Sequence, residues 1–570
     1  MKAFLALLAI SVLPIFPFVP ILNAASALPI PTTGVYLGVW ANPNSASNQE
    51  AAIELLEGPS GINRPFALHL AYYGWTDLSQ LLNSAGVFQP DTNLEGDIDH
   101  GRVPVISWTC DRKTTNSDHI IASGDPTEDA NITATAKALA QYPGPVLLRW
   151  FWEFNLINAN DGNQPCRNDN GTPTQQVYTD FIGAWQHIYQ LFQTAGATNV
   201  VFLWNPGHYT DGNPDDPHGY YPGNAYVDWI GIDTYQRAQT QTFTSDFEEF
   251  YTDFSASQYG GKPLMVGENA SANESVYNAE LQPTYLNGIL ADLTSNLYPA
   301  LKAYDYFDGP GNAPDDWVLD AQGLRAFATA ATNPAFLPAP TLTSAANGAT
   351  YYPGGLVPGS WALVKGTGLS NVTRIWNSTD FNGNNLPTSL SGVQLTVNGI
   401  PAAIYYINSS QINFQVPAGI TGQAAIQVRY AGASSNTLTT TAATSAPGLF
   451  PNIQGSSAYP AAVFLDGTYV GSRAAKPGDV IELFATGLEA EPAGIVPTAA
   501  AIQGVTVTLG TTVIPATYAG QTAYVGEFQI NFTVPNLPAG SYAVSIQLNN
   551  VSSPQTVNTT PPLQLTIPIQ

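Results

Sequence analysis

The sequence predicts a (β/α)8 barrel followed by two all-β sandwiches, and three observations carry this prediction. Apolar runs alternate with helix-like segments between residues 34 and 335. The composition then changes after Asn333-Pro334 to short alternating runs rich in Thr, Val, Ala, Gly and Pro. Within that second part, a seven-residue motif recurs after 118 residues. A chain of 570 residues is also too long for one ordinary domain.

The barrel is predicted from eight apolar runs that read as buried parallel strands. The runs are Val35–Ala41, Phe66–Trp75, Val103–Cys110, Val146–Asn155, Val200–Pro206, Val227–Tyr235, Pro263–Ala270 and Leu301–Gly309. Helix-like segments lie between several of them, such as Asp129–Gln141, Thr174–Thr194 and Ser245–Ser257. Eight βα units in about 300 residues are typical of the (β/α)8 barrel. A doubly wound sheet is the alternative, but no glycine-rich phosphate loop follows the first run.

The second part of the chain reads as two immunoglobulin-like modules. The run 411–417 (QINFQVP) recurs as 529–535 (QINFTVP), and Pro358-Gly359 recurs as Pro477-Gly478. This repeat predicts two β-sandwiches of about 110 residues each. We expect a barrel over residues 28–335, a stiff proline-rich linker over 336–340, and sandwiches over 341–447 and 448–570.

The first 27 residues are predicted to be a secretory signal peptide. One early lysine, Lys2, precedes a long apolar stretch, and Ala25-Ser26-Ala27 offers a cleavage site. No later segment is long and apolar enough to span a bilayer. We therefore expect a secreted protein, extracellular or held at the cell surface.

The two cysteines, Cys110 and Cys166, are predicted to form a disulfide, because an exported protein meets an oxidising environment. The bond would tie the loop after the third strand to the loop after the fourth. Two cysteines do not provide a zinc site. No metal ion or organic cofactor is expected.

The charge of the chain limits its partners. The formal net charge is −25, although charged residues make up only 10% of the sequence. Such a surface repels nucleic acid and anionic membranes, so neither is expected as a partner. It would also repel an acidic polysaccharide, which favours a neutral one.

Two carboxylates stand at the carboxyl ends of predicted strands, Glu153 on the fourth run and Glu268 on the seventh. Barrel enzymes place their chemistry at these ends. Two carboxylates converging on one face are what hydrolysis of a glycosidic bond needs. Indole rings near them suit the flat faces of pyranose sugars, and amides suit sugar hydroxyls.

The barrel resembles glycoside hydrolase family 26, whose type members are β-1,4-mannanases. The resemblance rests on 149–155 (RWFWEFN), Trp204-Asn205-Pro206, 227–235 (VDWIGIDTY) and 262–268 (KPLMVGE). It implies a retaining mechanism with Glu153 as acid/base and Glu268 as nucleophile. The predicted substrate-binding residues are Arg149, Trp152, Asn155, Trp108, Trp204, Asn205, Asp233, Tyr235, Tyr306 and Trp317.

Chemistry supports the same assignment. A retaining enzyme holds its two carboxyl groups about 5–5.5 Å apart. Aromatic neighbours of Glu153 would desolvate it, which suits a general acid. Glu268 has to stay ionised to attack the anomeric carbon, and Arg149 or Tyr235 could hold it so by charge or hydrogen bond.

Two positions depart from the family pattern. Members carry a histidine just before the acid/base, where this chain has Trp152, and tend to have another after strand three, where it has Trp108-Thr109-Cys110. Those histidines contact the sugar next to the scissile bond, so the departure bears on which sugar is accepted. The alternatives are a β-glucanase or xylanase of the same clan, or a non-catalytic glycan-binding surface protein. The C-terminal modules resemble tandem immunoglobulin-like modules of acidobacterial proteins, and could contact glycans or the cell surface.

Overall fold

The computed structural model describes residues 28–31, 34–41, 48–111, 116–156, 166, 174–208, 216–277, 280–311, 315–336, 339–430, 433–494 and 501–570. The predicted signal peptide, residues 1–27, lies outside these ranges, as do residues 337 and 338 of the predicted linker. Among the described residues, no helix has the length and apolar character that crossing a membrane requires.

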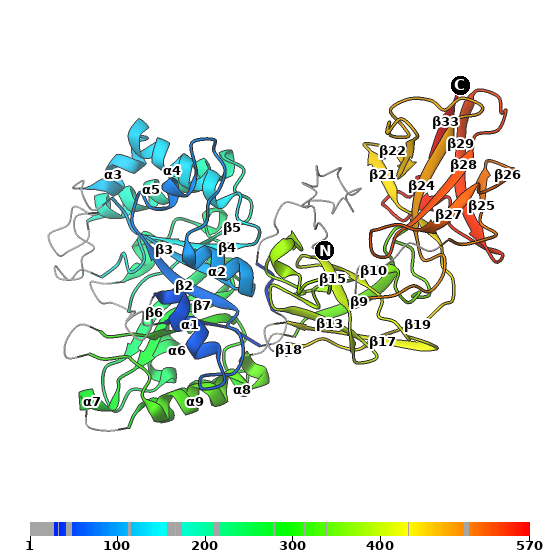
Figure 1. Cartoon of the computed structure of the whole chain (residues 1–570). Helices are drawn as coiled ribbons and strands as arrows, with labels where there is room; N and C mark the ends of the chain where they lie inside the picture. Colours follow the sequence, from blue (N-terminus) through cyan, green and yellow to red (C-terminus); the bar gives the residue numbers. More distant parts are fainter. Residues whose placement is uncertain are drawn as a thin grey trace, which may run out of the picture.

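The N-terminal part of the chain is a closed parallel barrel, as predicted, in which eight strands pair in sequence order and β8 pairs with β1 (Figure 1). The strands are β1 (Tyr36–Ala41), β2 (Leu68–Tyr73), β3 (Val103–Trp108), β4 (Val146–Trp150), β5 (Val200–Trp204), β6 (Trp229–Gln236), β7 (Leu264–Ser271) and β8 (Leu301–Asp308). Several strands are shorter than their apolar runs. The last residues of the second and fourth runs form the loops that follow β2 and β4.

Helices surround the barrel. They are α1 (Gln49–Glu57), α2 (Thr92–His100), α3 (Ser117–Ala122), α4 (Pro126–Leu139), α5 (Gln175–Thr194), α6 (Phe243–Phe254), α7 (Glu274–Tyr277), α8 (Gln282–Thr294) and α9 (Ala321–Ala331). Short 3-10 turns are η2 (Leu78–Leu81), η3 (Pro217–Tyr220), η4 (Asn224–Tyr226), η5 (Ser257–Tyr259) and η6 (Pro334–Phe336). The predicted helix Ser245–Ser257 begins earlier, at Phe243, because the Thr242 side chain caps it by accepting from the Ser245 amide.

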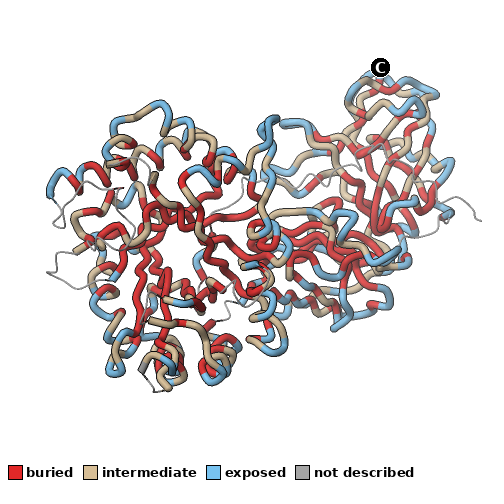
Figure 2. The backbone as a smooth tube through the Cα atoms, turned by 60° about the vertical axis from the view of Figure 1, so that its left-hand side comes forward, coloured by how far each residue is buried: buried red, intermediate tan, exposed pale blue. Residues whose placement is uncertain are grey.

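The interior of the barrel changes from apolar to charged along the strands. Successive side chains of a strand alternate between the interior and the helices. The lower interior is filled by Leu68, Leu70, Val103, Val105, Leu147, Val201, Leu203, Met265 and Ala303. Two residues further along β3, β4 and β5, the inward positions carry Ser107, Arg149 and Asn205. Figure 2 shows the strands as a continuous buried ring. Polar chemistry is therefore concentrated at the carboxyl end.

A second charged cluster lies behind the strands, between α1, α2 and β3. The buried guanidinium of Arg102 donates to Glu50 (2.8 Å), Asp97 (3.0 Å) and Glu57 (3.1 Å). Asp97 also contacts Nδ1 of His69 at 2.9 Å. Because Arg102 forms ion pairs with carboxylates of both α1 and α2, the cluster holds these two helices against the barrel.

The C-terminal part contains antiparallel sheets, as predicted for two immunoglobulin-like sandwiches. The first set has β9 (Thr341–Asn347), β10 (Trp361–Thr367), β11 (Arg374–Ile375), β12 (Ser389–Leu390), β13 (Val393–Val397), β14 (Ile400–Pro401), β15 (Ala403–Ile407), β16 (Gln411–Gln415), β17 (Gln423–Tyr430), β18 (Ala433–Ser434) and β19 (Leu438–Thr441), with η7 (Ser378–Asp380). Its sheets run β11-β15-β16-β10-β9 and β12-β13-β17-β18, with β14 beside β13 and β19 beside β17.

The second set has β20 (Gly448–Leu449), β21 (Pro451–Gln454), β22 (Ser457–Pro460), β23 (Ala462–Phe464), β24 (Val480–Thr486), β25 (Thr506–Leu509), β26 (Thr512–Pro515), β27 (Tyr518–Gln521), β28 (Phe528–Thr533), β29 (Gly540–Leu548), β30 (Val551–Ser552), β31 (Thr556–Val557), β32 (Leu563–Gln564) and β33 (Thr566–Ile569). The repeated motif forms β16 in the first set and β28 in the second. Both are interior strands of their sheets, which explains why the repeat is apolar and regular.

The first sandwich contacts the barrel at the amino ends of β3 and β4. The Tyr430 hydroxyl donates to the carbonyl of Gly101, just before β3, and Ser391 Oγ donates to the carbonyl of Ile98 at 2.7 Å. The Thr373 amide donates to the carbonyl of Pro143, before β4. This end is opposite to the one that carries the charged residues, so the sandwich leaves that end uncovered (Figure 1).

The two sandwiches also contact each other. The Trp361 amide donates to Thr486 Oγ1 at 3.0 Å, and its indole N–H donates to the carbonyl of Val525 at 2.7 Å. The Leu386 amide donates to the carbonyl of Gly494 at 3.0 Å. We propose the module boundaries 341–447 and 448–570 on this arrangement of strands.

Candidate active site

Glu153 lies on a strained turn directly after β4. Phe151 and Glu153 adopt left-handed backbone conformations, with φ of 49° and 55°. Such a conformation costs an ordinary residue about 1–2 kcal/mol and persists only where the surroundings impose it. Here the Phe151 amide donates to the carbonyl of Trp108, and the Glu153 amide to the carbonyl of Asn205, both at 2.9 Å. The neighbouring strands thus hold the half-buried Glu153 at the carboxyl end of the barrel.

Glu268 is turned into the barrel by an irregularity in β7. The register between β6 and β7 shifts so that Ile232 pairs with Val266 but Asp233 pairs with Glu268. The extra residue is Gly267, and a bulge of this kind lets two successive residues face the same side. A Cβ at Gly267 would lie 2.2 Å from Asn205 Oδ1 and 3.0 Å from Arg149 Nη1. Only glycine fits between these groups.

Three donors hold the Glu268 carboxylate. The Tyr72 hydroxyl and Arg149 Nη2 donate to Oε1, and the Tyr235 hydroxyl donates to Oε2. They come from β2, β4 and β6, and the carboxylate is only 5% exposed. Hydrogen bonds from charged or strongly polar donors to a carboxylate are short and orienting. Both residues that the sequence suggested for holding Glu268, Arg149 and Tyr235, contact it.

Arg149 is the centre of a buried network. Its Nε donates to Ser107 Oγ at 2.7 Å, and its Nη1 donates to both carboxylate oxygens of Asp233 at 2.9 Å. Asn205 Nδ2 donates to Asp233 Oδ1, also at 2.9 Å. Arg149, Asp233 and Asn205 are all at most 1% exposed. Asp233 and Asn205 thus hold Arg149, which in turn holds Glu268, and contact of the three residues with substrate stays a prediction.

The tyrosines beside Glu268 have raised pKa values. The pKa of Tyr235 is raised well above its usual value, mainly by burial. The charge of Glu268 raises it further, as do Tyr72, Asp233 and Glu153 to a smaller extent. Burial and the charge of Glu268 do the same to the pKa of Tyr72. Both phenols therefore stay protonated and can donate. Trp152, which directly precedes Glu153, packs on Tyr72 with ring centres 5.2 Å apart, and Tyr72 donates to Glu268. Glu153, just after β4, and Glu268, on β7, therefore lie close together at the carboxyl end of the barrel.

Aromatic side chains line this end of the barrel. Trp40 stacks on Phe307 with ring centres 4.5 Å apart, and Tyr235 stacks on Trp317 at 4.9 Å. Trp152 packs on Tyr72 at 5.2 Å and is partly exposed. Trp152, Tyr235 and Trp317 belong to this set, and their contact with substrate stays a prediction.

Three of these residues, Trp40, Tyr72 and Phe307, were missing from the sequence prediction. Trp40 and Phe307 stand one residue before the ends of β1 and β8, and Tyr72 one residue before the end of β2. Counting alternate positions from the apolar interior of each strand would have found all three.

Trp108, Trp204 and Tyr306, which the sequence suggested as substrate-binding residues, lie in a different layer of the barrel. All three are fully buried in the layer between the strands and the helices. The indole of Trp108 stacks on Trp75 and donates to its carbonyl at 3.1 Å. The physical reason is alternation: each of the three stands next to an inward position of its strand and points outward.

Asn155, which the sequence suggested as a sugar ligand, is also buried. Its amide oxygen accepts from the Gly207 amide at 2.7 Å, and its Nδ2 donates to the carbonyl of His208 at 3.3 Å. These bonds join the loop after β4 to the loop after β5. Asn155 therefore supports the turn that carries Glu153.

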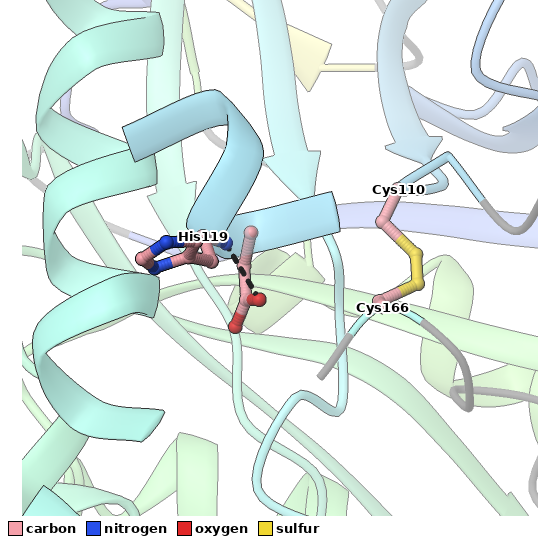
Figure 3. Close-up of a disulfide and its surroundings, with 4 residues drawn as sticks. Cys110, His119 and Cys166 are labelled. Carbon is pink, nitrogen blue, oxygen red and sulfur yellow. Dashed lines mark hydrogen bonds between the residues drawn. A yellow bond between two sulfur atoms is a disulfide. The ribbon is translucent and has the colours of Figure 1, made fainter. Parts of the chain in front are cut away.

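The predicted disulfide is present. Cys110 and Cys166 are bonded, with their Cα atoms 5.8 Å apart, a distance typical of disulfides. The bond joins the chain after β3 to the chain after β4 (Figure 3). Nearby, Nδ1 of His119 on α3 contacts Asp180 Oδ1 of α5 at 2.9 Å.

Reduction of the Cys110–Cys166 bond is expected to destabilise the barrel by about 2–4 kcal/mol, because 56 residues separate the two cysteines and the unfolded chain gains freedom. Urea unfolding with and without reductant measures the change. The Cys110→Ser and Cys166→Ser double variant should match the reduced protein and be insensitive to reductant. Two reactive thiols in the untreated protein would contradict the bond.

Substitution of Arg149 by lysine is expected to lower kcat by at least about 100-fold and stability by about 3 kcal/mol. Lysine keeps the charge but cannot reach Ser107, Asp233 and Glu268 together, and a broken buried ion pair is costly. Kinetics and urea unfolding check both effects. Arg325→Lys on the exposed side of α9 is the matched control. Wild-type kcat in Arg149→Lys would contradict the positioning role.

Known protein families match both parts of the chain. Residues 132–281 match the family model of glycosyl hydrolase family 26, a range that runs from α4 past β7 and includes Glu153 and Glu268. Residues 378–443 match the IPT/TIG domain. Both assignments agree with the resemblances stated from the sequence.

Curated relatives match over limited regions. Endoglucanase H of Acetivibrio thermocellus is 32% identical over 148 residues, which are 25% of this chain and 16% of that protein. A β-1,3-xylanase, TXYA, from a Vibrio species is 30% identical over 105 residues, 18% of this chain and 20% of that protein. The chain thus spans a fifth or less of these relatives' length. Among solved structures, a family 26 β-mannanase from Bacteroides ovatus aligns with 15% identity and a TM-score of 0.38, covering 53% of this chain and 90% of that one.

Proposed function

We propose that this protein, whose barrel is a glycosyl hydrolase family 26 domain followed by immunoglobulin-like modules, is a secreted retaining endo-β-glycanase. Its substrate class is a neutral polysaccharide, with β-1,4-mannan as the first candidate. The observation that supports the proposal is that Glu153, just after β4, and Glu268, on β7, lie at the same end of the barrel and are linked through the contact of Trp152 with Tyr72, with Glu268 held by Tyr72, Arg149 and Tyr235.

The proposed mechanism has two displacements. Glu268 attacks the anomeric carbon while Glu153 gives its proton to the leaving glycosidic oxygen, so a glycosyl ester forms and the bond to the leaving sugar breaks. Glu153, now a carboxylate, then takes a proton from water, and the resulting hydroxide equivalent displaces Glu268. Two inversions give net retention, and both carboxyl groups return to their starting protonation states.

The atoms of Glu268 have different roles in this proposal. Oε1 accepts from both Tyr72 and Arg149, whereas among the described residues Oε2 accepts only from Tyr235. The oxygen with fewer donors is the better nucleophile, since it gives up less stabilisation when it bonds to carbon. We therefore assign Oε2 as the attacking atom. Tyr235 is the residue whose hydrogen bond to this oxygen changes when the oxygen bonds to carbon.

Trp152 supports a second candidate, a β-glucanase or xylanase. The indole packs on Tyr72 beside the nucleophile, where family members carry a histidine that contacts the sugar. A bulky apolar ring offers stacking rather than a hydrogen bond to a sugar hydroxyl. Two of the curated relatives carry the names endoglucanase and β-1,3-xylanase, and both names favour the same candidate.

A substrate panel tests the proposal. The purified protein is incubated with β-1,4-mannan, glucomannan, mixed-linkage β-glucan, β-1,4-xylan and β-1,3-xylan, and reducing ends are counted. Proton NMR of the first product distinguishes retention from inversion. Release of short oligosaccharides with the β configuration supports the proposal, and the best substrate chooses between mannanase and the second candidate. Binding without release of reducing ends from any substrate would identify a non-catalytic glycan-binding protein.

Export is part of the proposal. The signal-like first 27 residues and the disulfide both suit an extracellular protein. Expression of the full chain with N-terminal sequencing of the secreted product tests it, with cleavage expected near Ala27. Retention of the whole chain inside the cell would count against it.

A further inference from the structure

A second cleft opens on the catalytic face of the barrel, beyond the carboxyl ends of β2 and β3. It has a volume of about 540 Å³ and lies between the loops after these strands and the first turns of α4. The residues that matter for its chemistry are Trp75, Asp77, Thr109, Glu128 and Asn131. Its volume is within the range of small-molecule sites, about 300–1,000 Å³.

The walls of the cleft are fixed by hydrogen bonds. The indole N–H of Trp75 donates to Glu128 Oε2 at 2.7 Å, and Asn131 Nδ2 donates to the carbonyl of Trp75 at 2.8 Å. Asp77 Oδ2 accepts from the Gly74 amide at 2.6 Å. Trp75 is also stacked on Trp108, with ring centres 4.4 Å apart. Each of these two carboxylates is therefore oriented by a hydrogen bond to one of its oxygens.

The chemistry of the cleft suits a neutral polyhydroxylated ligand. Carboxylate oxygens of Asp77 and Glu128 accept from hydroxyls, and Asn131 and Thr109 both donate and accept. No lysine or arginine lines the described walls of the cleft, so an anionic sugar finds no counter-ion there. Burial raises the pKa of Glu128, against the lowering effect of the Trp75 bond, and the nearby charges of Asp111 and Asp125 raise it further.

The cleft is close to the candidate catalytic residues along the chain after β2, and the disulfide lies in its wall. Tyr72, which donates to Glu268, precedes Gly74 in the cleft wall by two residues, or about 7 Å of extended chain. On the other side, Cys110 in the wall is bonded to Cys166 in the segment after Glu153. The cleft therefore lies at the same end of the barrel as Glu268, next to the strand that supplies Tyr72.

We propose that this cleft is an accessory subsite that binds one or two neutral sugar units of the polysaccharide at a distance from the bond being cleaved. Asp77 and Glu128 accept from the sugar hydroxyls, and the Trp75 indole fixes Glu128 for this purpose. The proposal rests on the glycanase function proposed above. In it, the cleft strengthens the binding of long polysaccharide chains.

Steady-state kinetics of the full-length protein test the subsite. In Glu128→Gln and in Asp77→Asn, KM for the best polysaccharide should rise about tenfold, because a hydrogen bond from a ligand to a charged group is lost, while kcat changes little. The matched control is Glu95→Gln on the exposed surface of α2, which should leave KM unchanged. Trp75→Phe retains a ring against Trp108 but removes the bond to Glu128, and should raise KM in the same way.

Calorimetry separates this proposal from the glycanase function. A Glu268→Ala variant is titrated with neutral oligosaccharides of two to six units, with and without Glu128→Gln. Affinity that rises with chain length only when Glu128 is present supports the subsite. Unchanged KM in all three cleft variants of an active enzyme would overturn the subsite and leave the glycanase standing. A wild-type protein that cleaves nothing would remove the glycanase, whereas the length-dependent binding could still be measured. Binding of Ca²⁺ to the cleft in place of sugar would overturn the subsite.

Discussion

Replacement of Glu268 by alanine is expected to lower kcat on polysaccharide by at least about 10⁴-fold and to leave glycan binding largely intact. The carboxylate is held by Tyr72, Arg149 and Tyr235 at the floor of the site, so its loss removes the nucleophile without removing the aromatic walls. Reducing-end release and binding to immobilised glycan are the two measurements. Glu248→Ala, on the exposed surface of α6, is the matched control.

A small anion should rescue Glu268→Ala in a diagnostic way. Azide fits the space left by the carboxylate and attacks the anomeric carbon from the same side, which gives a glycosyl azide of inverted configuration. This product requires an activated aryl glycoside whose leaving group departs readily. Hydrolysis by Glu268→Ala at the wild-type rate, after removal of contaminating activity, would exclude Glu268 as nucleophile.

Replacement of Glu153 by alanine should have an effect that depends on the leaving group. Hydrolysis of polysaccharide should fall about 10²–10⁴-fold, because the departing sugar needs a proton. A dinitrophenyl glycoside needs no such help, so its first step should proceed nearly normally. The second step still needs a base, and the glycosyl-enzyme should therefore accumulate and lower the apparent KM. A burst of dinitrophenol followed by slow turnover is the expected record.

Azide also distinguishes Glu153 from Glu268. In Glu153→Ala it attacks the glycosyl-enzyme from the face where water normally enters, so the glycosyl azide keeps the substrate's configuration. The alkaline decline of kcat/KM should also disappear for the activated substrate, because no proton donor is left to titrate. Equal losses on polysaccharide and on the dinitrophenyl glycoside would remove Glu153 from the acid/base role.

The fold could be predicted because buried parallel strands leave a simple pattern. Each barrel strand is covered by helices on one side and by the barrel interior on the other, so it reads as a continuous apolar run. The ends of the strands were less clear, since residues such as Trp75 are apolar but belong to loops. The tandem sandwiches were visible because β16 and β28 repeat nearly the same residues.

The site could be predicted only in part, because which side of a strand a residue faces matters more than its type. Trp108 and Trp204 have suitable rings but point toward the helices, whereas Trp40 points inward and was overlooked. Strict alternation would have sorted these three. It would have failed at Glu268, because the bulge at Gly267 reverses the alternation and depends on pairing with β6. The left-handed turn at Glu153 is likewise imposed by neighbouring strands.

The contact of Tyr430 and Ser391 with the barrel floor bears on how the proposed glycanase would reach an insoluble polysaccharide. The first sandwich is bonded to the base of the barrel, and Trp361 bonds it to the second sandwich. The two modules therefore act as a rigid spacer and not as a flexible linker. If the far module is anchored, the mouth of the barrel faces outward from the anchor. The open end of the barrel would then point toward the polysaccharide, and the C-terminal modules would not have to fold back beside it.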